Sequence, residues 1–210
     1  IEVVGVDVNQ HAVDTINKGR IYIVEPELDI LVRATVQTGH LRAVLQPEKA
    51  DAFIVTVPTP FKGDYKPDLS FIETAARSIA AVLEKGNLVI LESTSPVGTT
   101  EQMTAWMKLE RPDLSFPEFS VDKVVDVAVA HCPERVMPGH IVRELVENDR
   151  IIGGMTSHCA ERAHGLYKAF VKGDCLITDC RTAELSKLVE NSFRDVNIAF
   201  ANELSLICDK

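Results

Sequence analysis

Apolar and polar positions along this chain alternate in blocks that predict strands and helices in turn. Short apolar runs of strand length stand at residues 1–6, 51–57, 87–91, 126–131, 151–154 and 175–178. Segments with apolar residues at helical spacing lie between them, at residues 10–18, 27–38, 68–86, 100–109 and 157–170. Repeated strand–helix units of this length predict a mainly parallel, doubly wound α/β sheet with helices on both faces.

The last segment, from about residue 182 to the chain end, predicts one long helix with two different faces. Spacings of three and four place on one face Glu184, Lys187, Asn191, Arg194, Ile198 and Asn202. The other face carries enough apolar side chains to bury: Leu185, Leu188, Val189, Phe193, Val196, Phe200 and Leu204. A stripe of Lys, Asn and Arg suits an anionic ligand, and a solvated outer face is the alternative.

Composition and charge narrow the class of protein. Hydrophobic residues make up 46% and charged residues 25%, which is ordinary for a globular protein. The net charge of -9 argues against a nucleic-acid surface. No run approaches the roughly 18 apolar residues that span a bilayer. The five cysteines are scattered, without zinc spacing, so we expect reduced, mostly buried thiols in a cytosolic protein and no metal site.

Polar motifs follow three of the predicted strands. Ligands of doubly wound sheets bind beyond the carboxyl ends of the strands, where Thr59, Thr94 and Arg135 fall. Hydroxyl groups there can bond ribose, pyrophosphate or a water molecule. The guanidinium of Arg135 offers a planar fork for phosphate or carboxylate. The alternatives are ordinary turn residues for the two threonines and a surface ion pair for Arg135.

Asp7 ends the first apolar run and precedes a predicted helix. In a dinucleotide-binding unit, an acidic residue at this point bonds the adenosine ribose hydroxyls and repels a 2′-phosphate. No Arg stands among the next four residues, which favours NAD over NADP. The alternative is a simple helix cap.

Taken together, these segments resemble the UDP-glucose/GDP-mannose dehydrogenase family. The resemblance runs in order over the whole chain, through Asp7 and residues 57–60, 93–98, 132–135 and 183–203. It implies a Rossmann-like NAD-binding domain at residues 1–178 and the start of a long central helix, used for dimerisation, at residues 179–210. The family's C-terminal UDP-binding domain lies outside this sequence.

The resemblance also implies an activity, a four-electron oxidation of a sugar C6 alcohol to a carboxylate by two NAD in the cytoplasm. Residues 58–64, 92–98, 133–136 and 191–206 look like the branch that oxidises UDP-N-acetyl-D-mannosamine for bacterial surface polysaccharides. The implied catalytic residues are Lys187, Asn191 and Thr94, and the implied NAD contacts are Asp7, Thr59 and Thr94. The implied nucleotide-sugar contacts are Glu134, Arg135, Val136, Lys187, Asn191 and Arg194.

Three departures from the family pattern matter. The family's first strand and the Gly-rich dinucleotide turn that follows it are absent from this sequence. No cysteine occupies the motif of the family's catalytic cysteine. Pro138 stands where relatives that oxidise UDP-glucose carry a second Glu, which favours an acetamido sugar. The family's first strand is central in such a sheet, so a sheet without it has two more exposed strand edges. We therefore expect the 210-residue chain alone to be unstable and inactive.

Other functions stay open from the sequence. Within enzymes, these are oxidation of UDP-glucose or GDP-mannose, and a β-hydroxyacid dehydrogenase, which the 133–135 segment and Arg194 disfavour. Outside enzymes, the chain suits a truncated, non-catalytic nucleotide-sugar binder. The intact pair Lys187 and Asn191 argues for a working enzyme instead.

Overall fold

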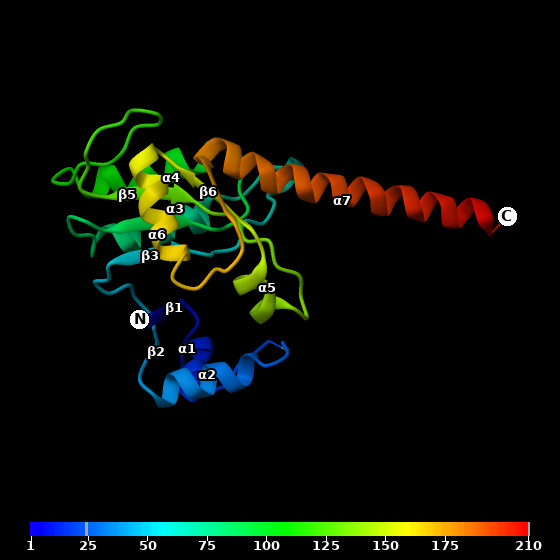
Figure 1. Cartoon of the computed structure of the whole chain (residues 1–210), viewed down its shortest axis with the longest axis horizontal. Coiled ribbons are helices and arrows are strands. Elements are labelled where there is room, and N and C mark those ends of the chain that lie inside the picture. The colour runs from blue at the N-terminus through cyan, green and yellow to red at the C-terminus, as the bar shows by residue number, and fades with distance from the viewer. Residues whose placement is uncertain (24, 210) are drawn as a thin grey trace.

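The computed structural model describes residues 1–23 and 25–209. Figure 1 shows an α/β body from which one long helix, α7 (Cys180–Cys208), projects far to one side. The strands form a five-stranded sheet, in the order β3-β4-β5-β6-β7, and a separate pair, β1-β2. The expected α/β architecture with a long final helix is confirmed.

The five-stranded sheet contains β3 (Ala52–Val55), β4 (Leu88–Leu91), β5 (Ala128–His131), β6 (Arg150–Gly154) and β7 (Cys175–Asp179). All residues of β4 and β5 are buried, as in strands that are covered on both faces. The expectation of a mainly parallel sheet holds except between β5 and β6, which are antiparallel. The segment between β5 and β6 does not cross back over the sheet, so β6 runs in the opposite direction to β5.

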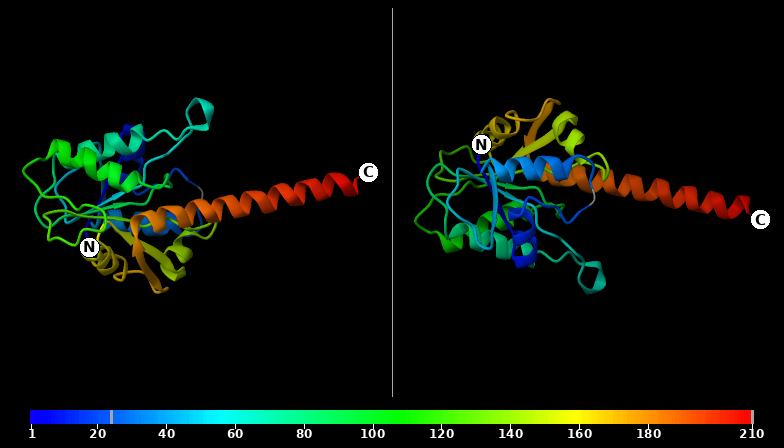
Figure 2. Two further views of the ribbon diagram at one scale, coloured as in Figure 1. Left: turned by 90° about the horizontal axis from the view of Figure 1, so that it is seen from above. Right: turned by 90° about the horizontal axis from the view of Figure 1, so that it is seen from below.

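Helices cover both faces of this sheet. Helices α3 (Ser70–Ala80) and α4 (Thr99–Glu110) pack together on one face, and α6 (Ser157–Tyr167) lies on the other (Figure 2). The first turns of α7 lie against β5, β6 and β7. This contact is so close that a Cβ on Gly153 would stand 2.5 Å from the Cβ of Ala183.

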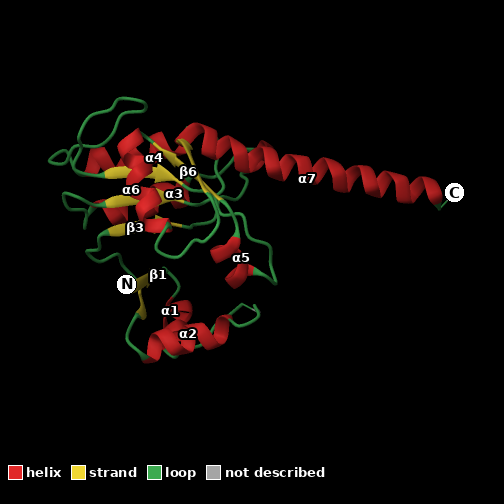
Figure 3. Ribbon diagram, viewed as in Figure 1, coloured by secondary structure: helices red, strands yellow, loops and turns green. Residues whose placement is uncertain are grey.

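The N-terminal unit pairs β1 (Val3–Val6) with β2 (Leu41–Val44) in parallel, beside α1 (Gln10–Asn17) and α2 (Leu28–Gln37) (Figure 3). The sequence did not predict β2, whose four residues include the exposed Arg42. The side chain of Asn17 fixes β2 by bonding both the N–H and the carbonyl of Ala43, at 2.7 and 2.9 Å. Strand β2 is therefore held by the side chain of a residue 26 positions earlier in the sequence, which its own apolar pattern does not show.

Helix α5 (Ile141–Glu147) was also not predicted. Its start is held by the buried carboxylate of Glu25, which accepts hydrogen bonds from the N–H groups of Gly139 and Ile141 at 2.9 and 2.8 Å. Glu25 stands shortly before α2, so this contact connects the N-terminal unit to the rest of the protein.

Several helix limits differ from those expected. Helix α3 ends at Ala80, not at Gly86, and its N-cap is Leu69. Asp68 instead accepts a hydrogen bond from the Ser70 N–H at 2.9 Å and pairs with Lys62 at 2.8 Å, which closes the 61–67 loop with its 3-10 turn (Gly63–Tyr65). All five cysteines are free, and three of them, Cys132, Cys159 and Cys180, are buried.

The two sheets have open strand edges. Among the described residues, β1 pairs with β2 alone and β3 with β4 alone, so each presents an unpaired edge. We expect the isolated 210-residue polypeptide to form no NADH from UDP-N-acetyl-D-mannosamine and to show no cooperative thermal transition. Turnover by this polypeptide in a spectrophotometric assay of NADH would show the expectation to be wrong, with a longer protein that contains the chain as the positive control.

Candidate active site

The loops after β3 and β4 are tied together at the carboxyl ends of their strands. The hydroxyl of Thr59 donates to the carbonyl oxygen of Thr94 at 2.6 Å, and the hydroxyl of Ser93 donates to the carbonyl of Val57 at 2.7 Å. Both threonines are half-buried. The structure thus brings together two of the predicted cofactor residues, although the Thr59 proton is already used within the protein.

Asp7 lies at the end of β1, in the N-terminal unit. One carboxylate oxygen accepts a hydrogen bond from the Asn9 N–H at 2.8 Å, and Asn9 caps α1. A carboxylate has about four acceptor positions, so the second oxygen can still accept from ribose hydroxyls. The residue therefore fits the adenosine end of NAD. Within the described residues, no hydrogen bond joins it to Thr59 or Thr94.

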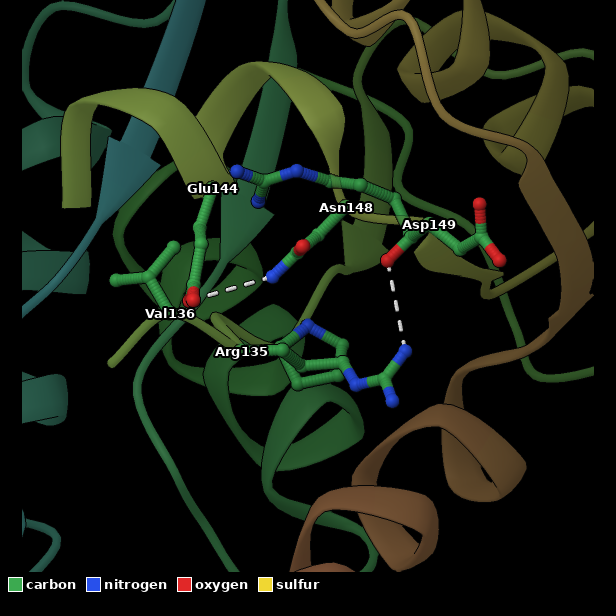
Figure 4. Close-up of a pocket in the computed structure, with 7 residues that line it drawn as sticks. Arg135, Val136, Glu144, Asn148 and Asp149 are labelled. Atoms are coloured by element: carbon green, nitrogen blue, oxygen red, sulfur yellow. Dashed lines mark hydrogen bonds between the residues drawn. The ribbon is translucent and has the colours of Figure 1, made fainter. Parts of the chain in front are cut away.

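Arg135 is held in an ion pair. This is the alternative to a free ligand-binding guanidinium that the sequence left open. Its Nε donates to one oxygen of Glu190 on α7 at 3.1 Å, and its Nη2 donates to the other oxygen. Its Nη1 donates to the Asp149 carbonyl at 3.4 Å (Figure 4). Sequence reasoning missed Glu190, although it lies three residues after Lys187 and four before Arg194, which is the spacing of neighbours on a helix.

The rest of the 133–136 segment is tightly folded. The carboxylate of Glu134 accepts a hydrogen bond from the Val136 N–H, two residues further on. Arg135 and Val136 also line a small open hollow with room for about one water molecule, together with Pro133, Glu144, Asn148, Asp149 and Arg150 (Figure 4). The hollow lies beside the Arg135 guanidinium and is open to solvent.

The residues of the predicted polar stripe of α7 differ in exposure. Lys187 is half-buried, and Asn191 and Arg194 are exposed. Glu184 does not belong to a ligand-facing surface, because it is only 1% exposed. Its carboxylate accepts hydrogen bonds from the Gly98 N–H at 2.6 Å, the Thr100 N–H at 2.7 Å and the Thr100 hydroxyl at 2.6 Å.

Glu184 thus binds the N-terminus of α4, where free N–H groups and the helix dipole favour a negative charge. Burial raises the pKa of Glu184, and the hydrogen bonds from Thr100 and Gly98 oppose that rise. The contact fixes the start of α7 against the loop that carries Thr94.

A buried polar network lies behind the 133–136 segment. The hydroxyl of Tyr167 donates to Glu92 at 2.5 Å, and Arg150 lies 3.5 Å from the same carboxylate and 5.0 Å from the centre of the Tyr167 ring. Burial raises the pKa of Glu92 and of the Cys132 thiol. A thiol whose pKa is raised is a poor nucleophile, which agrees with the expectation that no cysteine of this chain takes the place of the family's catalytic cysteine.

His131, at the end of β5, is fully buried, and neither ring nitrogen has a hydrogen-bond partner in the described part of the chain. It stands opposite Gly153 of β6. Opposite residues of antiparallel strands project to the same face, so the imidazole lies on the face that α7 covers. Burial lowers the pKa of His131 from 6.5 to about 4, and the ring is therefore neutral near pH 7.

A mainly parallel sheet with polar strand ends and a long following helix defines an α/β domain of the dinucleotide-binding class. Residues 1–171 match the model of the UDP-glucose/GDP-mannose dehydrogenase family, NAD binding domain, and residues 181–210 match the model of its central domain. The chain belongs to the UDP-glucose/GDP-mannose dehydrogenase family. The resemblance found in the sequence, and NAD as its cofactor, are confirmed.

Similar proteins include two acetamido-sugar enzymes by name. The chain is 66% identical over 211 residues to the UDP-N-acetyl-D-mannosamine dehydrogenase of Campylobacter jejuni, covering 100% of this chain and 52% of that protein. It is 66% identical over 209 residues to the NDP-N-acetyl-D-galactosaminuronic acid dehydrogenase of Ralstonia nicotianae, covering 100% and 49%. The chain therefore spans about half the length of these relatives.

A solved structure of UDP-D-ManNAc dehydrogenase from Pyrococcus horikoshii has a similar fold, with a TM-score of 0.90 and 44% identity. The similarity covers 98% of this chain and 48% of that one. A protein that contains this chain and has the length of its relatives is called the full-length protein below.

Removing the Glu184 carboxylate should destabilise the docking of α7. In Glu184→Ala, three donors lose their acceptor inside the protein, and we expect a loss of about 3 kcal/mol in the free energy of unfolding. Glu161→Ala, at an exposed position of α6, is the matched control and should change it by less than about 0.5 kcal/mol. Equal urea midpoints for the two full-length variants would contradict the role given to Glu184.

His131 should make the protein less stable in mild acid. Because its pKa is lowered on folding, from 6.5 to about 4, the unfolded chain binds a proton that the folded chain refuses. The stabilisation is complete above pH 6.5 and is lost as the pH falls towards 4, by about 2 kcal/mol between pH 7 and 5. In His131→Leu, urea unfolding of the full-length protein should lose this part of its pH dependence, and an unchanged slope would show the expectation to be wrong.

Proposed function

We propose that a full-length protein containing this chain oxidises the C6 alcohol of UDP-N-acetyl-D-mannosamine to the carboxylate, giving UDP-N-acetyl-D-mannosaminuronate. NAD supplies the hydride acceptor, and two NAD are used per sugar. The observation that carries the proposal is the face of α7 with Lys187 and Asn191, which the Arg135–Glu190 pair joins to the 133–136 segment. The product suits bacterial surface polysaccharide synthesis.

The proposed residues divide between chemistry and binding. Lys187 donates or accepts the proton of the sugar oxygen, or stabilises its negative charge, and Asn191 assists it. Thr94 contacts the nicotinamide side or positions a water molecule. Asp7 and Thr59 bind NAD, and the nucleotide sugar is held by Glu134, Arg135, Val136 and Arg194. The half-buried position of Lys187 supports its role, because partial burial strengthens its electrostatic effect.

A second acetamido sugar is the next candidate. The 66% identity to the NDP-N-acetyl-D-galactosaminuronic acid dehydrogenase of Ralstonia nicotianae favours an N-acetylgalactosamine-type nucleotide sugar as strongly as the 66% identity to the Campylobacter jejuni protein favours the mannosamine sugar. Pro138, at the position of the second Glu, disfavours UDP-glucose. A non-catalytic binder would bind either sugar nucleotide without reducing NAD.

We further propose that the full-length protein is a cytoplasmic homodimer joined through α7. The exposed face of this helix carries large apolar side chains, which a second copy would cover: Leu185, Val189, Phe193, Val196, Phe200 and Leu204. The free cysteines fit a reducing compartment. None of the helices among residues 1–23 and 25–209 is long and apolar enough to cross a membrane.

The activity can be tested directly on the full-length protein. We expect NADH formation with UDP-N-acetyl-D-mannosamine, at two NADH per sugar, and a fall in kcat of about 10²–10⁴ in Lys187→Ala. Lys123→Ala, at an exposed loop position, should leave kcat unchanged. Binding of both acetamido sugars without NADH formation would instead identify a binder, and turnover of UDP-glucose alone would identify the sister activity.

A further inference from the structure

The Arg135–Glu190 pair neutralises a cation inside the proposed site. Two nitrogens of the guanidinium bind the two oxygens of Glu190, and both side chains are about one-third exposed, at 33% and 36%. A ligand can therefore reach the pair, which has no net charge. A phosphate oxygen approaching Arg135 would meet the repulsion of the Glu190 carboxylate as well as the attraction of the guanidinium.

Hydrogen-bonding capacity nevertheless remains on Arg135. A guanidinium has five N–H groups, one on Nε and two on each terminal nitrogen. The three bonds to Glu190 and to the Asp149 carbonyl use one N–H on each nitrogen. Among the described residues, one N–H is left on each terminal nitrogen, beside the hollow that Arg135 lines.

Two cations of α7, Lys187 and Arg194, differ from Arg135 in having no ion-pair partner among the described residues. Lys187 lies one turn before Glu190 and Arg194 one turn after it. Within residues 1–23 and 25–209, neither makes an ion pair, and these two keep their full charge for anionic groups. The site thus presents two kinds of donor, charged ones on α7 and a neutralised one on the 133–136 segment.

We propose that Glu190 sets the specificity of Arg135: the neutralised guanidinium binds the acetamido carbonyl oxygen of the sugar, not the diphosphate. An amide carbonyl is the strongest uncharged acceptor that an acetamido sugar offers, and it carries no charge for Glu190 to repel. This inference rests on the proposed function. Glu190 acts through Arg135 and is a specificity-determining, positioning residue.

The test separates the two ends of the ligand in the full-length protein. It compares kcat/KM for UDP-N-acetyl-D-mannosamine and for UDP-mannose, which lacks the acetamido group, and measures inhibition by UDP, which lacks the sugar. In Arg135→Met we expect a fall of tenfold or more for the acetamido sugar. The value for UDP-mannose and the inhibition constant of UDP should each change by less than threefold.

Glu190→Gln is nearly isosteric and tests the role of the charge. We expect it to unmask Arg135, so that UDP inhibits more tightly and with a steeper salt dependence, while the preference for the acetamido sugar falls at least fivefold. Glu161→Gln, exposed on α6, is the matched control and should change none of these values. Thermal midpoints of all variants show whether each one is folded.

The outcomes are distinct. If Arg135→Met weakens UDP and the acetamido substrate equally, Arg135 binds the diphosphate and the inference is wrong. If neither variant changes the sugar preference, the pair only ties two segments together, and the inference is again wrong. If the unmodified protein forms no NADH from any acetamido sugar but binds UDP, the proposed function fails, whatever the variants do.

Discussion

One buried carboxylate, that of Glu184, holds the two halves of the candidate site in register. Removing a carboxylate from water is unfavourable unless donors surround it, and here the N-terminus of α4 supplies three of them. The bond fixes the first turns of α7 against the loop that follows β4. Because a helix is rigid over a few turns, the positions of Lys187, Asn191 and Arg194 follow from this one anchor.

A second connection, between Arg135 and Glu190, joins α7 nearly two turns after Glu184 to the segment after β5. Behind that segment, Glu92, Arg150 and Tyr167 form a buried polar cluster at the ends of the sheet. Polar groups in such a place rigidify the structure when each has its partners. The loops at the carboxyl ends of β4 and β5 are therefore held both from behind and from α7, which is the preorganisation that a binding site needs.

The alternation of strands and helices could be predicted from the sequence because continuous apolar runs are buried whatever their exact neighbours. Elements that depend on single side chains could not: β2 relies on Asn17, and α5 relies on Glu25 from a distant segment. Helical periodicity placed Glu184 on the same face as Lys187, yet periodicity does not say where along its length a helix leaves the core. Glu190, the partner of Arg135, was also missed. Its spacing of three and four residues from Lys187 and Arg194 places it near them on the helix, but spacing does not show which side chain from another segment it meets.

Helix α7 has 29 residues and is therefore about 44 Å long, and only its beginning is buried, at Cys180, Ala183 and Glu184. Successive side chains of a helix are offset by about 100° around its axis, so holding a few turns sets the direction of every side chain on them. The apolar side chains near its far end, such as Phe200 and Leu204, are exposed and lie beyond the turns that pack on the sheet. Glu184 and the Arg135–Glu190 pair hold the first turns, so a change at the far end, more than about 20 Å along the axis, alters the exposed apolar surface and leaves the angle of Lys187 unchanged.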